Sequence, residues 1–195
     1  MLRTEDPELL LGAAQYVGDL DLGNQLHMVF VRSEMAHALI TGIDTAAAQA
    51  APGVVAVWTA ADLGLDPFQS MVKVHDDFAR PALAGDRVRF VGEAIVAVVA
   101  DTVTQARDAA DMVIVDYETL DAAVTAEAAL ADDAPVLFEA HGDNIAIATT
   151  DPVNADLFAD ADVIIRGRYV NQRMAVAPME PHGAAAAIGD DGRLL

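Results

Sequence analysis

The chain of 195 residues contains no cysteine. This absence excludes disulfides, thiolate nucleophiles and cysteine-ligated iron–sulfur clusters within the chain, and with them most kinds of structural zinc site. Basic side chains are also scarce: 11 stand against 31 acidic ones, the formal net charge is -20, and Lys73 is the only lysine. A surface this negative repels phosphate groups, so we expect no nucleic-acid partner and no attraction to anionic membranes.

Long apolar runs and a targeting leader are missing as well. The first residues, Met1–Asp6, become acidic at once, and Leu9–Leu11 is too short for the core of a signal peptide. No run approaches the ~20 apolar residues of a membrane span, so we expect a cytoplasmic protein without membrane insertion. The hydrophobic fraction of 54% still supplies a core, and the length suits one domain or one domain plus part of another.

Two strand–helix–strand patterns organise the first part of the chain. Val54–Trp58 and Ala94–Ala100 are uninterrupted apolar runs, typical of strands buried on both faces. A capped helix is predicted beside each run: Thr45–Ala51 before the first, which Asp44 or Thr45 can cap, and Thr102–Ala110 after the second, where Thr102 and Gln105 form a capping box. Further strands are predicted at 26–31, 39–43 and 112–116. Such units imply right-handed crossovers, so an α/β layered domain is expected.

The remaining segments give weaker patterns. A short N-terminal helix is predicted with Asp6 as its cap and Gly12 at its end. Weak periodicity predicts a loop excursion over 65–89. The second half is expected to contain a helix at 125–130, a helix at 151–159, a strand at 162–170 and a hairpin of 184–188 with 193–195. The last strand stops after two apolar residues, which would leave an unpaired apolar edge, so we interpret the chain as interrupted.

Catalytic patterns are absent from the sequence. The two serines, Ser33 and Ser70, do not lie in a Gly-x-Ser-x-Gly elbow, and the five histidines have no metal-binding spacing. Carboxylates are too numerous for a catalytic pair to be chosen. We therefore predict no catalytic residue and no metal ligand, while a composite metal site built from distant histidines stays open as an alternative.

The segment around Glu180 is the most unusual in the chain. Met179 and Pro181 flank this glutamate in an otherwise apolar neighbourhood. One interpretation is a carboxylate held rigidly and partly desolvated, as at a functional site. The other is a structural carboxylate that accepts hydrogen bonds from the backbone or from arginine and fixes a turn.

Several motifs, taken in order, resemble one enzyme family. They are Arg3–Asp6, Leu11–Gly12, Tyr16–Asp19, Val31–Ala38 continuing to Ile43–Asp44, Pro52–Val57, Arg80–Ala84, Val91–Asp101, Val115–Glu118 and Pro178–Gly183. Together they resemble the start of the large, molybdenum-bearing subunit of the xanthine dehydrogenase, aldehyde oxidase and carbon monoxide dehydrogenase family. One departure is His182, which stands where the family usually has arginine. Each motif is weak alone, but their common order covers nearly the whole chain.

The resemblance implies a fold and shows which part of the enzyme holds the catalytic and cofactor-binding residues. It implies an α/β (α+β) fold, with an α/β-hammerhead domain and its N-terminal helix over 1–120, a connecting segment over 121–143, and the incomplete start of the first molybdopterin-binding domain over 144–195. In this family the catalytic and cofactor-binding residues lie further downstream. We therefore expect no cofactor-binding residue in this segment, with Gln172 and Glu180 placed beside the molybdenum pocket without touching the cofactor.

The resemblance also implies partners and a parent reaction. The intact subunit would hold molybdopterin, with iron–sulfur clusters and FAD on partner domains or subunits, in a homodimeric complex. The reaction would be oxidative hydroxylation of an aldehyde or heterocycle, or oxidation of carbon monoxide, and the chain alone would be an inactive scaffold. The alternative is a stand-alone, non-catalytic α/β module, derived from that family, that binds a partner or assists assembly.

Overall fold

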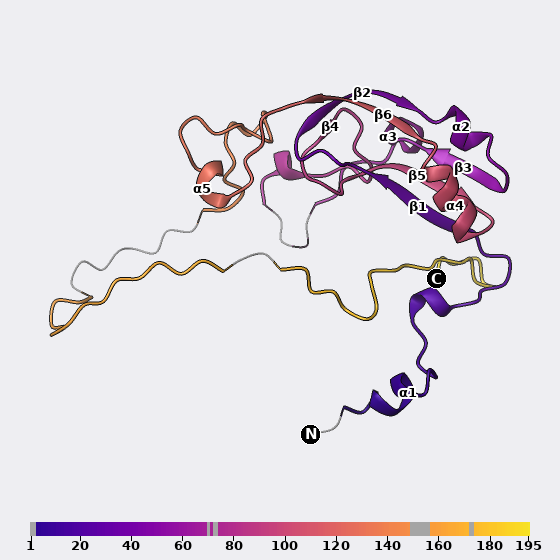
Figure 1. The fold of residues 1–195 in the computed structure, drawn as a ribbon, viewed down its shortest axis with the longest axis horizontal. Coiled ribbons are helices and arrows are strands. Elements are labelled where there is room, and N and C mark those ends of the chain that lie inside the picture. Colours follow the sequence, from indigo (N-terminus) through magenta and orange to yellow (C-terminus); the bar gives the residue numbers. More distant parts are fainter. Residues whose placement is uncertain (1–2, 70, 72–73, 149–156, 172–173) are drawn as a thin grey trace. The chain divides into compact units, whose positions relative to one another are not determined.

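The computed structural model describes residues 3–69, 71, 74–148, 157–171 and 174–195 (Figure 1). The chain divides into two compact units. The larger unit is Leu26–Asp151, and the smaller one combines Met1–Gln25 with Pro152–Leu195. The described residues form six strands, and all of these lie in the larger unit.

The first sheet of the larger unit has β5 at its centre. It is built from β1 (His27–Arg32), β5 (Ala94–Ala100) and β3 (Val54–Trp58), in the order β1-β5-β3. Both pairings are antiparallel, and Val98 faces Val29 on one side and Val57 on the other. The sequence prediction of these strands is confirmed within one residue.

The second sheet has the order β4-β2-β6 and is also antiparallel. Its strands are β4 (Arg87–Val88), β2 (Ala38–Asp44) and β6 (Ile114–Thr119). The register between β2 and β6 shifts between Ile40 and Gly42, which marks a bulge.

The predicted right-handed parallel crossovers are wrong. The first helix of the two patterns, α2 (Ala46–Gln49), leads from β2 in one sheet to β3 in the other. The second, α4 (Val103–Ala110), leads from β5 back to β6. Each connection therefore joins two different sheets, and the architecture is α+β with two small antiparallel sheets rather than one parallel sheet.

The helix caps follow the sequence in part. The Thr102 hydroxyl accepts a hydrogen bond from the Gln105 backbone N–H (3.2 Å), as predicted, and the same hydroxyl lies 2.8 Å from Gln105 Oε1. At α2 the N-cap Thr45 makes no side-chain cap bond, and Asp44 Oδ1 accepts from the Ala46 N–H instead (2.9 Å). In α1 (Asp6–Leu10) the N-cap is Glu5, so the assignment of that role to Asp6 is wrong.

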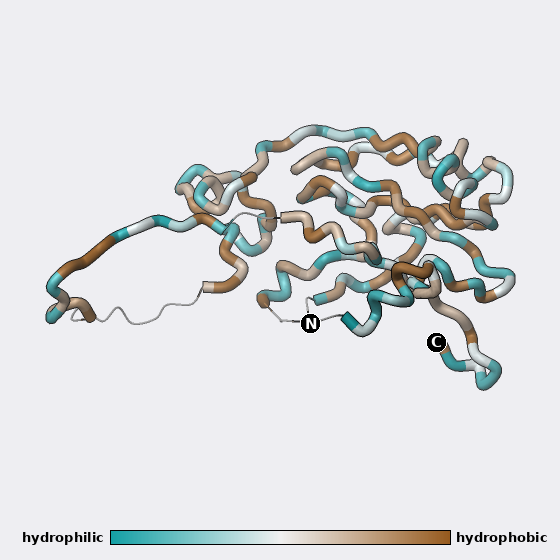
Figure 2. The backbone as a smooth tube through the Cα atoms, turned by 60° about the horizontal axis from the view of Figure 1, so that its bottom comes forward, coloured by the Kyte–Doolittle hydropathy of each residue, from teal (hydrophilic) through white to brown (hydrophobic). Residues whose placement is uncertain are grey.

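The core gathers small and branched side chains from both sheets and from α4. Ile95, Val96 and Val98 of β5 are fully buried and cluster with Ala38 and Val88 of the second sheet. On α4, the fully buried side chains are alanines, Ala106 and Ala109, which let the helix approach the sheet closely. Hydrophobic residues recur along the strands of this unit (Figure 2).

One burial prediction is wrong for β3. The apolar run Val54–Trp58 was expected to be buried on both faces, yet Val55 and Trp58 are exposed. The reason is the position of β3 at the edge of its sheet, where β5 is its only neighbouring strand.

The remaining elements of the larger unit are short. They are α3 (Ala60–Leu63), the 3-10 helix η2 (Asp76–Phe78) and α5 (Ala126–Ala129). The predicted excursion over 65–89 is mostly loop in its described residues, and a bridge joins Phe68 to Arg80. The short helix predicted at 125–130 is confirmed by α5.

The smaller unit has little regular structure among its described residues. It contains α1 and the 3-10 helix η1 (Val17–Asp19). The predicted strand at 162–170 is wrong, because the described chain offers it no sheet to join. The predicted hairpin is confirmed at its turn end: Ile188 and Leu194 form an isolated antiparallel bridge, and Ala187 and Leu195 exchange two backbone hydrogen bonds (2.8 and 3.1 Å). Most of the predicted helix at 151–159 lies outside the described residues.

None of the described helices is long and apolar enough to cross a membrane.

Candidate functional site

Glu180 is the one predicted pocket residue that the structure describes, since Gln172 lies outside the described residues. Its side chain is exposed, which contradicts the interpretation of a partly desolvated carboxylate and agrees with that of a structural carboxylate that accepts a backbone hydrogen bond. Its Oε1 accepts a hydrogen bond from the Val17 backbone N–H at 3.0 Å. Nearby, a Cβ placed on Gly183 would lie 3.3 Å from the Val17 side chain. Glu180 thus joins the two stretches of the smaller unit, while its position beside a molybdenum pocket stays a prediction.

Large apolar side chains stand exposed in the smaller unit. Ile165 is 87% exposed, Tyr169 93% and Val176 88%. Others that are more than half exposed are Leu10, Leu11, Leu157, Phe158, Val163, Val170, Met174, Met179, Ile188, Leu194 and Leu195. Exposed apolar surface on this scale is typical of an interface that another polypeptide segment covers.

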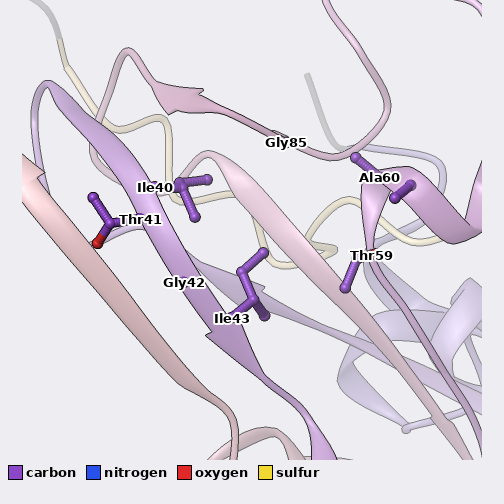
Figure 3. Close-up of a pocket in the computed structure, with 8 residues that line it drawn as sticks. Ile40, Thr41, Gly42, Ile43, Thr59, Ala60 and Gly85 are labelled. Carbon is purple, nitrogen blue, oxygen red and sulfur yellow. The ribbon is translucent and has the colours of Figure 1, made fainter.

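A hollow of about 320 Å³ opens beside β2 in the larger unit (Figure 3). Ile40, Thr41, Gly42 and Ile43 line it from the strand, and Thr59, Ala60, Ala61 and Gly85 complete the lining. None of these side chains is charged. The hollow therefore offers no cationic side chain to the phosphate of a molybdopterin.

Next to this hollow, a capping box begins α3. Asp62 Oδ2 accepts hydrogen bonds from the Thr59 backbone N–H (2.8 Å) and from the Thr59 hydroxyl (2.7 Å). The backbone bond first, and the hydroxyl bond second, lower the pKa of the Asp62 carboxyl below its ordinary value. The ionised carboxylate is thus the form that fits the start of the helix.

This pKa shift predicts a pH dependence of stability. Because the folded-state pKa of Asp62 lies below the unfolded one, the stabilisation is complete well above about pH 4 and is lost as pH falls through the lowered value. We expect Asp62→Asn to be less stable than the unaltered chain at neutral pH and to lose less stability on acidification. Urea unfolding midpoints across this range measure the effect. Asp66→Asn, outside the helix, is the control, and its unfolding midpoints should match those of the unaltered chain across this pH range.

A cluster of two histidines and one aspartate lies elsewhere in the larger unit. His75, Asp77 and His141 each bring one potential ligand atom within 4.8 Å of the others. His75 and Asp77 come from the start of η2, and His141 lies beyond α5. Sequence spacing gave no signal for this cluster, because a loop excursion and a distant segment supply its members. It is an instance of the composite arrangement that the sequence left open.

The architecture of the larger unit, two three-stranded antiparallel sheets of which the first packs against α4, defines an α/β-hammerhead domain. Comparison with known proteins supports this assignment. Residues 11–121 match the family model described as "Aldehyde oxidase and xanthine dehydrogenase, a/b hammerhead domain". The chain therefore belongs to the aldehyde oxidase and xanthine dehydrogenase family, which confirms the resemblance seen in the sequence.

Individual relatives agree with the family model. The chain is 39% identical over 192 residues to the nicotine 6-hydroxylase large subunit of Paenarthrobacter nicotinovorans, covering 94% of this chain and 23% of that protein. It is 36% identical over 194 residues to the carbon monoxide dehydrogenase large chain of Afipia carboxidovorans, covering 91% and 24%. The chain thus spans about a quarter of these relatives, at their N-terminal end.

A solved structure gives the same result in three dimensions. The aldehyde oxidoreductase from Desulfovibrio gigas superposes with a TM-score of 0.80 at 31% identity. The match covers 98% of this chain and 22% of the other. The similarity therefore extends over both units of the chain, beyond the hammerhead domain itself.

Proposed function

We propose that this chain is the N-terminal scaffold and interface portion of a molybdenum hydroxylase large subunit. The observation that carries the proposal is the alignment of nearly the whole chain with the N-terminal part of such subunits. In this proposal 1–120 is the hammerhead domain, 121–143 a connecting segment, and 144–195 the opening of the first molybdopterin-binding domain.

The exposed apolar side chains support an interface role. Ile165, Tyr169 and Val176 are almost wholly exposed in the described residues. At about 25 cal/mol per Å², burying such side chains against the rest of a subunit contributes substantially to assembly. The negative charge of the chain would add electrostatic selection among partners.

The parent enzyme would oxidise an aldehyde or a heterocycle, or carbon monoxide, with oxygen supplied by water. These are the substrate classes in the names of the relatives, nicotine 6-hydroxylase, aldehyde oxidoreductase and carbon monoxide dehydrogenase. Molybdopterin supplies the redox chemistry when it is bound. Electrons would pass to iron–sulfur clusters and FAD on partner domains or subunits, and the complex would be a homodimer in the cytoplasm. In the chain itself, Glu180 holds the Val17 amide and the hollow beside β2 supplies no charged group for a phosphate.

The test is purification of the natural protein through a tag placed at its chromosomal locus. We expect the tagged polypeptide to co-purify with stoichiometric molybdenum, iron and flavin. We also expect the chain produced alone to retain no molybdenum when molybdopterin is added. Stoichiometric binding by the chain alone would contradict a scaffold role. A natural complex that lacks molybdenum would instead favour a stand-alone binding module.

A further inference from the structure

Three side chains in the larger unit have the chemistry and the spacing of a metal site. We propose that His75, Asp77 and His141 bind a divalent transition-metal ion of the zinc class, distinct from the molybdenum centre of the proposed function. Their potential ligand atoms lie within 4.8 Å of one another. Two imidazole nitrogens and one carboxylate oxygen are ligands that zinc takes in proteins.

The distances are close to those of a coordinated ion. Asp77 Oδ2 lies 2.9 Å from His75 Nδ1 and 3.4 Å from His141 Nδ1. In a tetrahedral zinc site with bonds of about 2.0–2.2 Å, neighbouring ligand atoms are roughly 3.3–3.5 Å apart. The remaining pair, His75 and His141, has its ligand atoms within 4.8 Å, so side-chain rotations that shorten this distance would bring the three atoms onto one ion.

The hydrogen bonds around His75 point to a cation at this place. The Asp77 backbone N–H donates to His75 Nδ1 (3.3 Å), so this nitrogen acts as an acceptor, and a metal ion would take the same lone pair in place of this long hydrogen bond. The carboxylate oxygen 2.9 Å away is also electron-rich. Two such atoms repel each other unless a cation, either a proton or a metal ion, lies between them.

His141 is held in an orientation that suits a metal ligand. Its side chain is only 20% exposed, and its ring packs against Phe78 with 4.5 Å between the ring centroids. While Nδ1 faces Asp77, the other ring nitrogen, Nε2, faces Asp143 Oδ1 at 3.6 Å. A carboxylate behind the second nitrogen is the usual means of fixing the tautomer of a metal-binding histidine.

The donor set also selects among metals. Calcium and magnesium prefer sites made wholly of oxygen, whereas imidazole suits zinc and its neighbours among the transition metals. The side chain of His75 is 59% exposed, so an ion can enter from solvent and water can complete its coordination. A bound ion would tie the 65–89 excursion to the segment beyond α5.

Titration of the full chain with zinc chloride tests the proposal. After treatment with EDTA and return to neutral buffer, calorimetry should show one saturable equivalent of zinc. Cobalt, as a spectroscopic probe, should give visible absorption bands that excess zinc abolishes. Neither readout depends on molybdenum or on enzyme activity, so failure here leaves the proposed function untouched.

Variants locate the ion. We expect His75→Gln and Asp77→Asn to weaken zinc binding about 100-fold, and Asp143→Asn about tenfold. The matched control is His182→Gln, an exposed histidine of the smaller unit, which should bind as the unaltered chain does. Because His75 is the most exposed of the three ligands, its variant should keep the circular dichroism spectrum of the folded chain.

Two outcomes would overturn the proposal. One is the absence of saturable zinc binding in the unaltered chain, which would leave a protonated imidazole as the cation beside Asp77. The other is zinc binding that survives unchanged in the folded His75→Gln and Asp77→Asn variants.

Discussion

Replacement of Ile95 by alanine is expected to lower the free energy of unfolding by about 2–5 kcal/mol. Ile95 is fully buried on the central strand β5 and belongs to the cluster that both sheets share. The substitution removes three side-chain carbons from a fully buried position that the surrounding core residues cannot fully refill, so much of the cavity should persist. Urea unfolding followed by circular dichroism measures the loss.

The matched control is Ile114→Ala. Ile114 carries the same side chain on β6 but is 59% exposed, so its truncation should cost less than about 1 kcal/mol. Equal losses at the two positions would show that β5 does not occupy the centre of the core.

Replacement of Glu93 by alanine is expected to lower the free energy of unfolding by about 1–3 kcal/mol. This is the penalty for leaving a buried hydrogen-bonding group without its partner. Glu93 is 7% exposed, and its Oε2 accepts from the Arg89 backbone N–H at 2.6 Å. The Arg89 side chain in turn donates from Nε to the Leu137 carbonyl (2.8 Å) and lies over the ring of Phe138. The loss should therefore also loosen the segment around Leu137, which hydrogen exchange would detect.

Two further variants separate this buried hydrogen bond from simple charge removal. Glu93→Gln keeps an amide oxygen in place of the acceptor, so it should lose less stability than Glu93→Ala. Glu139→Ala removes a carboxylate that is 73% exposed and pairs with Arg87 at 3.0 Å, and it should change stability by at most about 1 kcal/mol. A loss from Glu93→Gln as large as that from Glu93→Ala would contradict the role of the Arg89 bond.

The strands could be predicted from the sequence because their signal is local. The run Ala94–Ala100 is apolar throughout, and a central strand buried on both faces needs that composition. The same kind of run at Val54–Trp58 predicts a strand correctly, but it wrongly predicts burial on both faces. Hydropathy does not show which strand lies at the edge of a sheet. Periodicity also carries no information on pairing, so the antiparallel order of two sheets was missed.

The strand predicted at 162–170 failed for a related reason. Val163, Ile164 and Ile165 favour extended backbone, but a strand is stable only when a neighbour satisfies its N–H and C=O groups. The described chain provides no such neighbour there. The local preference of this segment for extended backbone is real, but a strand also needs a tertiary partner, which local sequence does not show.

The candidate site was the least predictable feature. His75 and His141 share no motif and become neighbours only because the fold returns one loop against another. Glu180 was singled out for its apolar neighbours in sequence, yet chain neighbours do not determine burial, and the side chain is exposed. By contrast, the family can be recognised from the sequence alone, because several short motifs occur in the same order along the chain as in the family.

The central position of β5 has a consequence for synthesis on the ribosome. Both β1 and β3 hydrogen-bond only to β5 in their sheet. In the other sheet β2 pairs with β4 and β6, which are both synthesised after it. At roughly 5–20 residues per second, β1 stays without a partner for several seconds after it is made. During that interval its backbone edge is open to pairing with other nascent chains. A chaperone that shields residues 27–58 until β5 emerges should therefore raise the yield of folded protein more than one that acts after release.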